Sequence, residues 1–317
     1  MTSTPSRESR QVRLLDGGFA THLETLGANL GDDPLWSAKL LLSDDGMRLV
    51  EKVHLDYLMA GCDILTTASY QAHIPTSAIS HPLPTQITNS KETLELLFVK
   101  AMKAAKTAKE NYRRSTTDKP DRIIHIAGSM GSFGAVLANG AEYSGDFAGV
   151  TWDSLVEFHR LRIAAVIATE PDLLAFETIP SVFESSAIVR ALDICAETLT
   201  IPPAWIAFSF RSAELSCGGN SIAACANSVK NKNVFAVGVN CTKPEFLEDI
   251  LFGLKSNLPE NIELICYPNK GETWDAKSRE WVISSGLPSE TTFADLGEKW
   301  MKAGATIIGG VQIIYVN

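Results

Sequence analysis

No stretch of the sequence approaches the about 20 consecutive apolar residues that a membrane-spanning helix requires, which argues against an integral membrane protein. Basic charge is also scarce, because 28 Lys and Arg stand against 37 Asp and Glu and the net charge is −9. A pI near 5.2 argues against a nucleic-acid-binding surface, since phosphate contacts need clustered positive charge. The first 13 residues are polar and contain no secretory signal, so we expect a cytoplasmic protein with residues 1–11 as a disordered tail.

Sequence motifs for several cofactors and metals are absent as well. The six cysteines form no C-x-x-C pair, the six histidines form no H-x-x-x-H pair, and there is no Walker A motif. The segment GSMGSFG at 128–134 does not match G-x-G-x-x-G, so a dinucleotide site is not indicated. We expect reduced cysteines that are mostly small buried apolar residues, and histidines that lie on the surface or are hydrogen-bonded in the core.

The sequence does contain eight short apolar segments rich in β-branched residues. They cover residues 12–18, 62–70, 122–130, 172–180, 204–210, 234–240, 262–269 and 306–310. Each is too short for a typical helix and lacks strict polar alternation, which is the pattern of strands buried on both faces of a parallel sheet. Helical periodicity lies between them, over 46–60, over 91–113, over 152–169 with Asp153 as its N-cap, after Pro244, and from Phe293 to Lys302.

This alternation of strands and helices over about 300 residues predicts an α/β fold, a (β/α)8 or TIM barrel, as one domain covering residues 12–317. A doubly wound open sheet is the alternative, although it usually has fewer strands and a phosphate-binding glycine loop near its start. In a barrel, the long connections 71–90 and 131–150 belong to the carboxyl-terminal mouth, where active sites lie.

The predicted strands end in polar residues or glycine, and in a barrel these residues converge on one mouth. They include Asp16, Gly17, Gly18, Glu177, Asn240 and Cys241. The carboxylates of Asp16 and Glu177 are suited to hold a cationic amino group or to act as an acid/base pair. A turn role for Asp16 and an ion pair for Glu177 are the structural alternatives. Cys241 is suited to be a nucleophile or a metal ligand, and an inert thiol is the alternative.

Seven sequence blocks, in order and with matching spacing, resemble the homocysteine S-methyltransferases. They are DGGFATHLE (16–24), GCDILTTASYQA (61–72), GSMGSFGAVLANGAEYSGDF (128–147), PDLLAFETIP (171–180), GVNCTKP (238–244), YPNKGETWD (267–275) and GATIIGG (304–310). The resemblance implies a (β/α)8 barrel that transfers a methyl group from S-methylmethionine or S-adenosylmethionine to the sulfur of homocysteine, giving methionine. It also implies that Asp16 and Glu177 bind the amino acid, with Gly17, Gly18 and Asn240 in the same blocks.

The same resemblance implies a zinc ion held by three cysteine thiolates. One is Cys241, and the other two would be adjacent cysteines directly after the last Gly-Gly. In this sequence Val311 and Gln312 stand at those two positions, and we expect the helix after the eighth strand to be missing. Valine cannot ligate zinc and glutamine is a poor substitute for a thiolate, so the implied zinc site is incomplete.

Other cysteines do not obviously complete the site. Cys62 begins its predicted strand and Cys266 is in the middle of one, whereas Cys217 follows the fifth strand on the side of the mouth. We therefore expect little or no methyltransferase activity from this polypeptide. The alternative is a zinc-free, catalytically inactive homologue that binds an amino acid or acts as a regulatory partner. The sequence does not indicate the oligomeric state.

Overall fold

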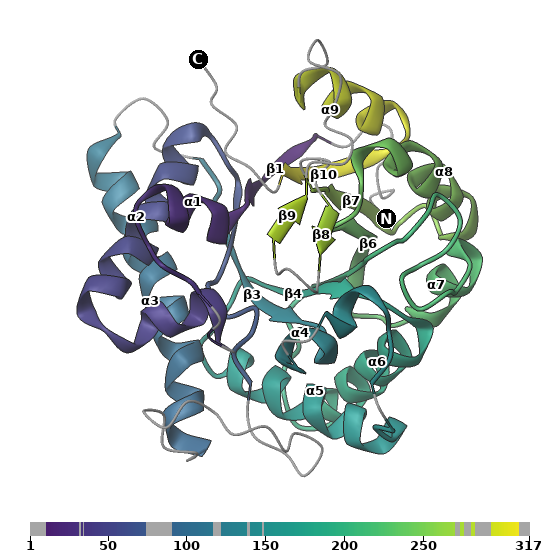
Figure 1. Cartoon of the computed structure of the whole chain (residues 1–317), viewed down its shortest axis with the longest axis horizontal. Coiled ribbons are helices and arrows are strands. Elements are labelled where there is room, and N and C mark those ends of the chain that lie inside the picture. The colour runs from purple at the N-terminus through teal and green to yellow at the C-terminus, as the bar shows by residue number, and fades with distance from the viewer. Residues whose placement is uncertain are drawn as a thin grey trace, which may run out of the picture.

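The computed structural model describes residues 11–31, 33, 35–73, 91–116, 122–137, 140–147, 149–269, 273–275, 280–282 and 293–310. Eight parallel strands close into a barrel in the order β1-β10-β7-β6-β5-β4-β3-β2. The predicted (β/α)8 barrel is thus confirmed, and the open-sheet alternative is wrong. Figure 1 looks along the barrel and shows the helices as a ring outside the strands. The expected tail at 1–10, Val311, Gln312 and the expected loss of a last helix lie outside the described residues.

The strands of the barrel lie where the apolar segments predict them. They are β1 (Arg13–Gly17), β2 (Ile64–Thr66), β3 (His125–Gly131), β4 (Leu173–Ile179), β5 (Ala204–Phe208), β6 (Val234–Asn240), β7 (Glu263–Tyr267) and β10 (Ala305–Gly310). Each pairs in parallel with its two neighbours, so all their carboxyl ends surround the same mouth. A separate antiparallel pair, β8 (Thr273–Asp275) and β9 (Glu280–Val282), was not predicted.

Helices connect these strands and cover the outside of the barrel. They are α1 (Phe19–Thr25), α2 (Asp44–Ala60), α3 (Lys91–Ser115), α4 (Phe133–Leu137), α5 (Trp152–Ile167), α6 (Val182–Ala196), α7 (Ile222–Ser228), α8 (Leu247–Asn257) and α9 (Phe293–Lys302). Short 3-10 turns form η2 (Trp36–Leu42), η3 (Ala141–Tyr143) and η4 (Pro244–Phe246). The periodicity of the sequence identified α2, α3, α5, α8 and α9, whereas α1, α4, α6 and α7 were missed.

The predicted N-cap of α5 is wrong by two residues. Thr151, and not Asp153, precedes the helix in extended conformation, and its hydroxyl accepts a hydrogen bond from the Ser154 amide at 3.2 Å. Asp153 lies in the first turn, where its carboxylate is favourable towards the positive end of the helix dipole. The helix ends at Ile167 instead of at residue 169.

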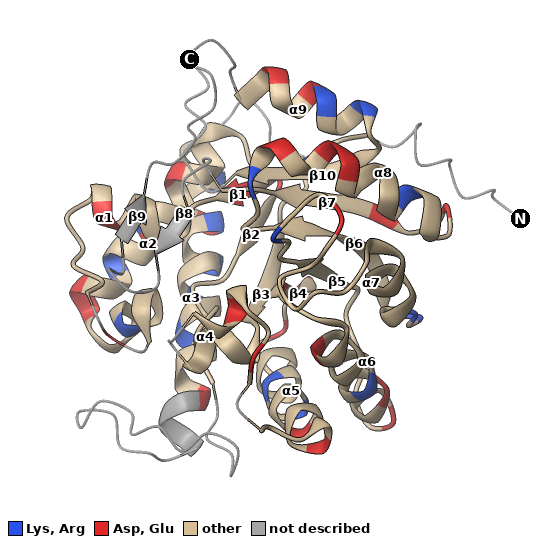
Figure 2. Cartoon of the chain, turned by 45° about the vertical axis from the view of Figure 1, so that its right-hand side comes forward, with Lys and Arg blue, Asp and Glu red and all other residues tan. Residues whose placement is uncertain are grey.

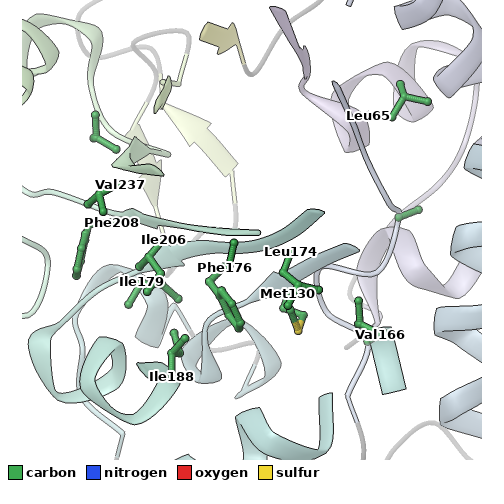
Figure 3. Close-up of a cluster of buried hydrophobic side chains, with 14 of the residues drawn as sticks. Leu65, Met130, Val166, Leu174, Phe176, Ile179, Ile188, Ile206, Phe208 and Val237 are labelled. Atoms are coloured by element: carbon green, nitrogen blue, oxygen red, sulfur yellow. The ribbon is translucent and has the colours of Figure 1, made fainter. Parts of the chain in front are cut away.

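The strands lie between two apolar layers, one inside the barrel and one outside it. The inner layer fills the lumen and consists of Leu15, Ile64, Ala127, Leu173, Ala175, Trp205, Ala207, Ala236, Ile265, Tyr267 and Ile307. The outer layer packs strands against helices, and Figure 3 shows part of it, with Phe176 and Ile206 from strands and Ile188 from α6. Because alternate strand residues enter the two layers, both faces of each strand are apolar. Polar side chains are therefore left mainly to the strand ends.

Charged residues lie mainly on the outer helices and connections in Figure 2, and the strands carry few. Within the part of the chain that the structure describes, no helix is both long enough and apolar enough to cross a bilayer.

Candidate active site

In β4, β6 and β7, the row of side chains that faces the lumen ends in a polar side chain at the carboxyl end of the strand. Glu177 follows Ala175 by two residues in β4, so the alternation of the strand turns both side chains towards the lumen. Asn240 and Tyr267 are the last residues of β6 and β7 and end the corresponding rows there. The same alternation that fills the lumen with apolar groups thus delivers a carboxyl, an amide and a phenol to the mouth.

Glu177 is held by two hydroxyl groups. Its Oε1 atom accepts a hydrogen bond from the Ser129 hydroxyl at 2.5 Å, and its side chain also hydrogen-bonds to Tyr267. Tyr267 is itself fixed, because its hydroxyl accepts a hydrogen bond from Trp205 Nε1 at 3.1 Å. Burial raises the pKa of Glu177 to about 7, although the two hydrogen bonds lower it. Among the described residues no Lys or Arg pairs with this carboxyl group.

Asp16 is held by the neighbouring strand β2. Its Oδ2 atom accepts from the Thr66 amide at 2.6 Å, and its Oδ1 atom accepts from the Thr66 hydroxyl at 3.0 Å. Only 3% of the residue is exposed. Burial raises the pKa of Asp16 well above its usual value, the Thr66 hydrogen bonds lower it, and the nearby charge of Glu177 raises it further.

The charge of Glu177 is among the causes that raise the pKa of Asp16, which indicates that the two carboxyl groups lie in the same part of the mouth. The Asp16 carboxyl group hydrogen-bonds to Thr66 of β2, so its contacts do not support the turn role with Gly17 and Gly18. The ion-pair alternative for Glu177 also fails within the described residues, since its polar partners there are Ser129 and Tyr267. Two buried carboxyl groups that have no basic partner among the described residues suit a cationic amino group.

Gly17 lets the backbone of β1 run close to β10. It pairs with Gly310 in the barrel register, and a Cβ atom at Gly17 would come within 2.5 Å of the Gly310 carbonyl oxygen. Gly18 follows as the N-cap of α1 and provides no side chain to cap the helix. Glycine is therefore required at position 17, because a side chain there would meet both β10 and the Tyr57 ring.

Cys241 follows β6 directly and has φ 47°, an unusual value for a residue other than glycine. Its sulfur accepts hydrogen bonds from Thr178 Oγ1 at 3.5 Å and from Asn240 Nδ2 at 3.3 Å. Burial raises the pKa of Cys241 to about 11, against the effect of hydrogen bonds from Thr178 and Tyr143. Without an added positive charge this thiol is protonated at neutral pH, so an unassisted thiolate nucleophile is not favoured.

Asn240 fixes the surroundings of that thiol. Its Oδ1 atom accepts from the Thr178 amide at 2.8 Å and its Nδ2 atom donates to the Thr178 hydroxyl at 2.8 Å. Thr178 also has a positive φ, 57°, so two strained residues meet at this point. Such strain persists where the surrounding contacts determine the geometry, which is common at functional sites.

Several residues at the mouth were not singled out from the sequence. They are Thr66, Tyr70, Glu142 and Tyr143. Tyr70 hydrogen-bonds through its side chain to Thr178, and one carboxylate oxygen of Glu142, Oε2, is buried with no hydrogen-bond partner among the described residues. Glu142 and Tyr143 lie in the connection 131–150. The sequence could have pointed to them only through the predicted position of that connection at the mouth.

The family model of the homocysteine S-methyltransferases matches residues 13–311 of the chain. The chain belongs to this family. Homocysteine S-methyltransferase 3 of Zea mays is 40% identical over 302 residues, which cover 94% of this chain and 85% of the maize protein. Selenocysteine Se-methyltransferase of Brassica oleracea var. italica is 38% identical over 312 residues, covering 96% and 86%.

A solved structure agrees with this assignment to the homocysteine S-methyltransferase family. The metallated form of the homocysteine methyltransferase MmuM from Escherichia coli has a TM-score of 0.77 and 30% identity, covering 96% of this chain and 92% of that chain. The predicted resemblance is confirmed, and the protein is by family a methyltransferase.

The zinc site implied for a homocysteine S-methyltransferase is not matched by the donors of this chain. Within the described ranges, no group of three or more His, Cys, Asp or Glu side chains could hold a metal ion. Cys241 brings one thiol, and Cys217, whose amide donates to the Ser209 carbonyl oxygen at 2.9 Å, is buried at the neighbouring strand end. Val311 and Gln312 carry no thiol. This donor set does not fit three-thiolate zinc coordination.

Proposed function

We propose that this family member binds homocysteine at the barrel mouth and transfers to its sulfur a methyl group from S-methylmethionine or S-adenosylmethionine, giving methionine. The carrying observation is the pair Asp16 and Glu177, two buried carboxyl groups in one region without a Lys or Arg partner among the described residues. The ammonium group of an α-amino acid supplies the missing charge and donates hydrogen bonds to both. The names of the relatives support homocysteine as the amino acid.

The rest of the mouth suits such a ligand. Gly17 lets β1 pack against Gly310 and the Tyr57 ring beside Asp16, and Gly18 adds no side chain at this edge of the mouth. Asn240 holds the Cys241 and Thr178 side chains where β6 and β4 end at this mouth. Because a sulfonium donor already carries an activated methyl group, the protein's main task is to align the acceptor sulfur, the methyl carbon and the leaving sulfur.

Low turnover by this polypeptide is part of the proposal. A free thiol titrates near about pH 8.5, so most of the acceptor is protonated at neutral pH unless a positive centre stabilises its thiolate. With one thiol at Cys241 and Val311 and Gln312 in place of cysteines, we expect no stoichiometric zinc. The same observation favours a second candidate function, a zinc-free protein that binds an amino acid without turnover.

Calorimetry with homocysteine tests the binding site. We expect saturable binding to the full chain, and at least a tenfold loss of affinity in Glu177→Gln and in Asp16→Asn. Glu197→Gln, which changes an exposed carboxylate, serves as the matched control and should bind normally. Absence of homocysteine binding by the wild-type chain would overturn the proposal.

Zinc content and turnover separate the two candidate functions. The wild-type chain and the double variant Val311→Cys, Gln312→Cys are compared for bound zinc by mass spectrometry and for methionine formation from each donor. Homocysteine binding with measurable methionine formation supports the methyltransferase, whereas binding with no methionine from either donor supports the inactive amino-acid-binding protein. Stoichiometric zinc in the wild-type chain would refute the expectation of low turnover from an incomplete site.

We further propose that residues 12–317 act as one homocysteine-binding domain in the cytosol, within methionine biosynthesis. All six cysteines are free thiols, which suits a reducing compartment.

A further inference from the structure

Glu142 lies at the mouth with its backbone fixed from two sides. It belongs to η3, which follows α4, and Figure 1 shows α4 between the strands of the barrel and the outer helix α5. A Cβ atom at Gly134 would overlap with the Glu142 amide nitrogen, so this glycine permits the close approach of η3 to α4. On the other side, the Ser209 hydroxyl donates to the Glu142 carbonyl oxygen at 3.0 Å. The fold therefore fixes the backbone of Glu142 at the mouth.

The carboxyl group of Glu142 hydrogen-bonds to the backbone of Glu142 itself and still has one oxygen left over. Its Oε2 atom is buried and has no hydrogen-bond partner among the described residues, where no Lys or Arg pairs with it either. Burial raises the pKa of Glu142 to about 7, against the effect of its hydrogen bond to the backbone. A buried carboxylate oxygen without a partner among the described residues is suited to a cationic ligand.

Two tyrosines and the Cys241 thiol lie around this carboxyl group. Tyr143 is the next residue of η3 after Glu142, and Tyr70 hydrogen-bonds to Thr178, whose Oγ1 atom donates to the Cys241 sulfur at 3.5 Å. The charge of Glu142 is also among the causes that raise the pKa values of Tyr70, Tyr143 and Cys241. Tyr143 also hydrogen-bonds to the sulfur of Cys241. Glu142 belongs to η3, whereas Asp16 and Glu177 belong to β1 and β4, so Glu142 brings a further carboxyl group to the mouth from a separate element.

We propose that Glu142, together with Tyr70 and Tyr143, binds the sulfonium centre of the methyl donor and makes the site selective for a positively charged donor. This inference rests on the proposed function, which brings the ammonium group of the acceptor and a sulfonium donor to the mouth. The ammonium group of the acceptor occupies the Asp16–Glu177 pair, and the sulfonium group occupies the Glu142 position. A sulfonium ion is a diffuse cation, and such ions bind well where aromatic rings and a carboxylate are close together.

The chemistry of the transfer defines what Glu142 contributes. The ionised sulfur of the acceptor, its proton lost to solvent, attacks the methyl carbon while the bond between that carbon and the donor sulfur breaks. The bonding electron pair passes to the donor sulfur, which becomes a neutral thioether. The positive charge beside Glu142 is therefore greatest before transfer and absent afterwards. Glu142 strengthens binding of the donor over the product, and its loss should raise the donor KM more than it lowers kcat.

A pair of ligands with the same shape and different charge tests this assignment. S-methylmethionine has a sulfonium sulfur where 2-amino-5-methylhexanoic acid has a neutral CH group. Both compounds carry the same ammonium and carboxylate groups. We expect the wild-type chain to bind S-methylmethionine at least tenfold more tightly in calorimetry. In Glu142→Gln this preference should fall to within about twofold, while homocysteine affinity stays unchanged.

Further variants keep the result interpretable. Glu142→Asp retains the charge and should keep part of the preference, and Glu197→Gln should keep all of it. If the wild-type chain binds homocysteine but does not distinguish the two ligands, or if Glu142→Gln retains the preference, the sulfonium assignment is wrong and the proposed acceptor site stands. If homocysteine itself does not bind, the proposed function fails first.

Discussion

At the scale of the residue, the mouth holds carboxyl groups that are costly to the folded protein. Asp16, Glu177 and Glu142 all have raised pKa values because they are buried, and none has a basic partner among the described residues. Burying a charge without a partner is unfavourable, so such groups are expected where a ligand supplies the partner. These carboxyl groups therefore lower the stability of the ligand-free protein and favour the binding of a cationic ligand.

Replacement of Glu177 by Gln makes this cost measurable. The folded-state pKa of about 7 lies above the usual value of 4.5, so the folded protein retains the proton between those two values while the unfolded chain loses it. Wild-type stability thus falls as pH rises from about 4.5 through 7. We expect Glu177→Gln to be about 2–3 kcal/mol more stable at pH 8 and nearly unchanged at pH 4.5.

Urea unfolding at both pH values checks this, with Glu197→Gln as the exposed control. A Glu177→Gln variant that is less stable than the wild type at pH 8 would show that its hydrogen bonds with Ser129 and Tyr267 outweigh the burial of its charge.

Asn240 provides a second test at this scale. Asn240→Ala removes both hydrogen bonds to Thr178 and leaves a buried amide unsatisfied, which should cost about 2–4 kcal/mol. It also releases Cys241, the one cysteine that is not fully buried, so a disulfide reagent should modify this thiol faster. The exposed Asn227→Ala is the control. Unchanged thiol reactivity in a folded Asn240→Ala protein would contradict the positioning role.

At the scale of the element, the close approach of β6 to β7 positions Asn240 and Cys241 at the mouth. A Cβ atom at Gly238 would overlap with the Ile265 carbonyl oxygen, so only glycine fits there. Two residues later Asn240 pairs with Tyr267, and the Cys241 amide donates to the Tyr267 carbonyl oxygen at 3.2 Å. The register of these two strands therefore places the amide and the thiol next to the phenol.

Substitution of this glycine should break the arrangement. We expect Gly238→Ala to lose about 3 kcal/mol or more in urea unfolding, because β6 and β7 must separate to admit the methyl group. Gly297→Ala is a matched control in α9, where no atom lies within 4 Å of the added methyl group and where alanine should stabilise by about 0.5–1 kcal/mol. Equal effects of the two substitutions would argue against the strand-register explanation.

Helix α6 illustrates why some elements were missed from the sequence. Its buried face includes Glu184, whose Oε1 atom accepts from the Phe133 amide at 2.5 Å and contacts His159 Nε2 at 3.0 Å. A charged residue on the core side interrupts the apolar period that identifies an amphipathic helix. Only the partners on α4 and α5 explain why that carboxyl group is buried.

At the scale of the whole molecule, α2 presents a histidine that departs from expectation. His54 is fully buried beside Phe19, with ring centroids 4.7 Å apart, and neither ring nitrogen has a hydrogen-bond partner in the described part of the chain. The expectation that each core histidine is hydrogen-bonded is wrong here. Burial lowers the pKa of His54 from 6.5 to about 3.

Acid sensitivity of the fold follows from this residue. Between pH 6.5 and pH 3, His54 is protonated in the unfolded chain but neutral in the folded protein. The free energy of unfolding therefore falls as the pH drops from 6.5 towards 3. At pH 5 the loss is about 2 kcal/mol. We expect His54→Leu to remove this loss, so that its melting temperature changes less between pH 7.5 and pH 5 than that of the wild type. An identical pH dependence in both proteins would contradict this prediction.

The sequence by itself determined the barrel and the positions of its strands. Strands buried on two faces must be apolar throughout, so their polar ends stood out, and these ends included Asp16, Glu177, Asn240 and Cys241. Only the closed barrel decided which of these ends meet. It brought the charges of Asp16 and Glu177 together from strands far apart in the chain and placed Thr66 against Asp16.

The tertiary structure also decided the part played by the connections. Glu142 and Tyr143 come from a segment without regular periodicity, and no local pattern marks which of its side chains turns towards Cys241. The reason is physical: the period of a strand or helix fixes the direction of its side chains, whereas a loop takes its direction from the groups it packs against.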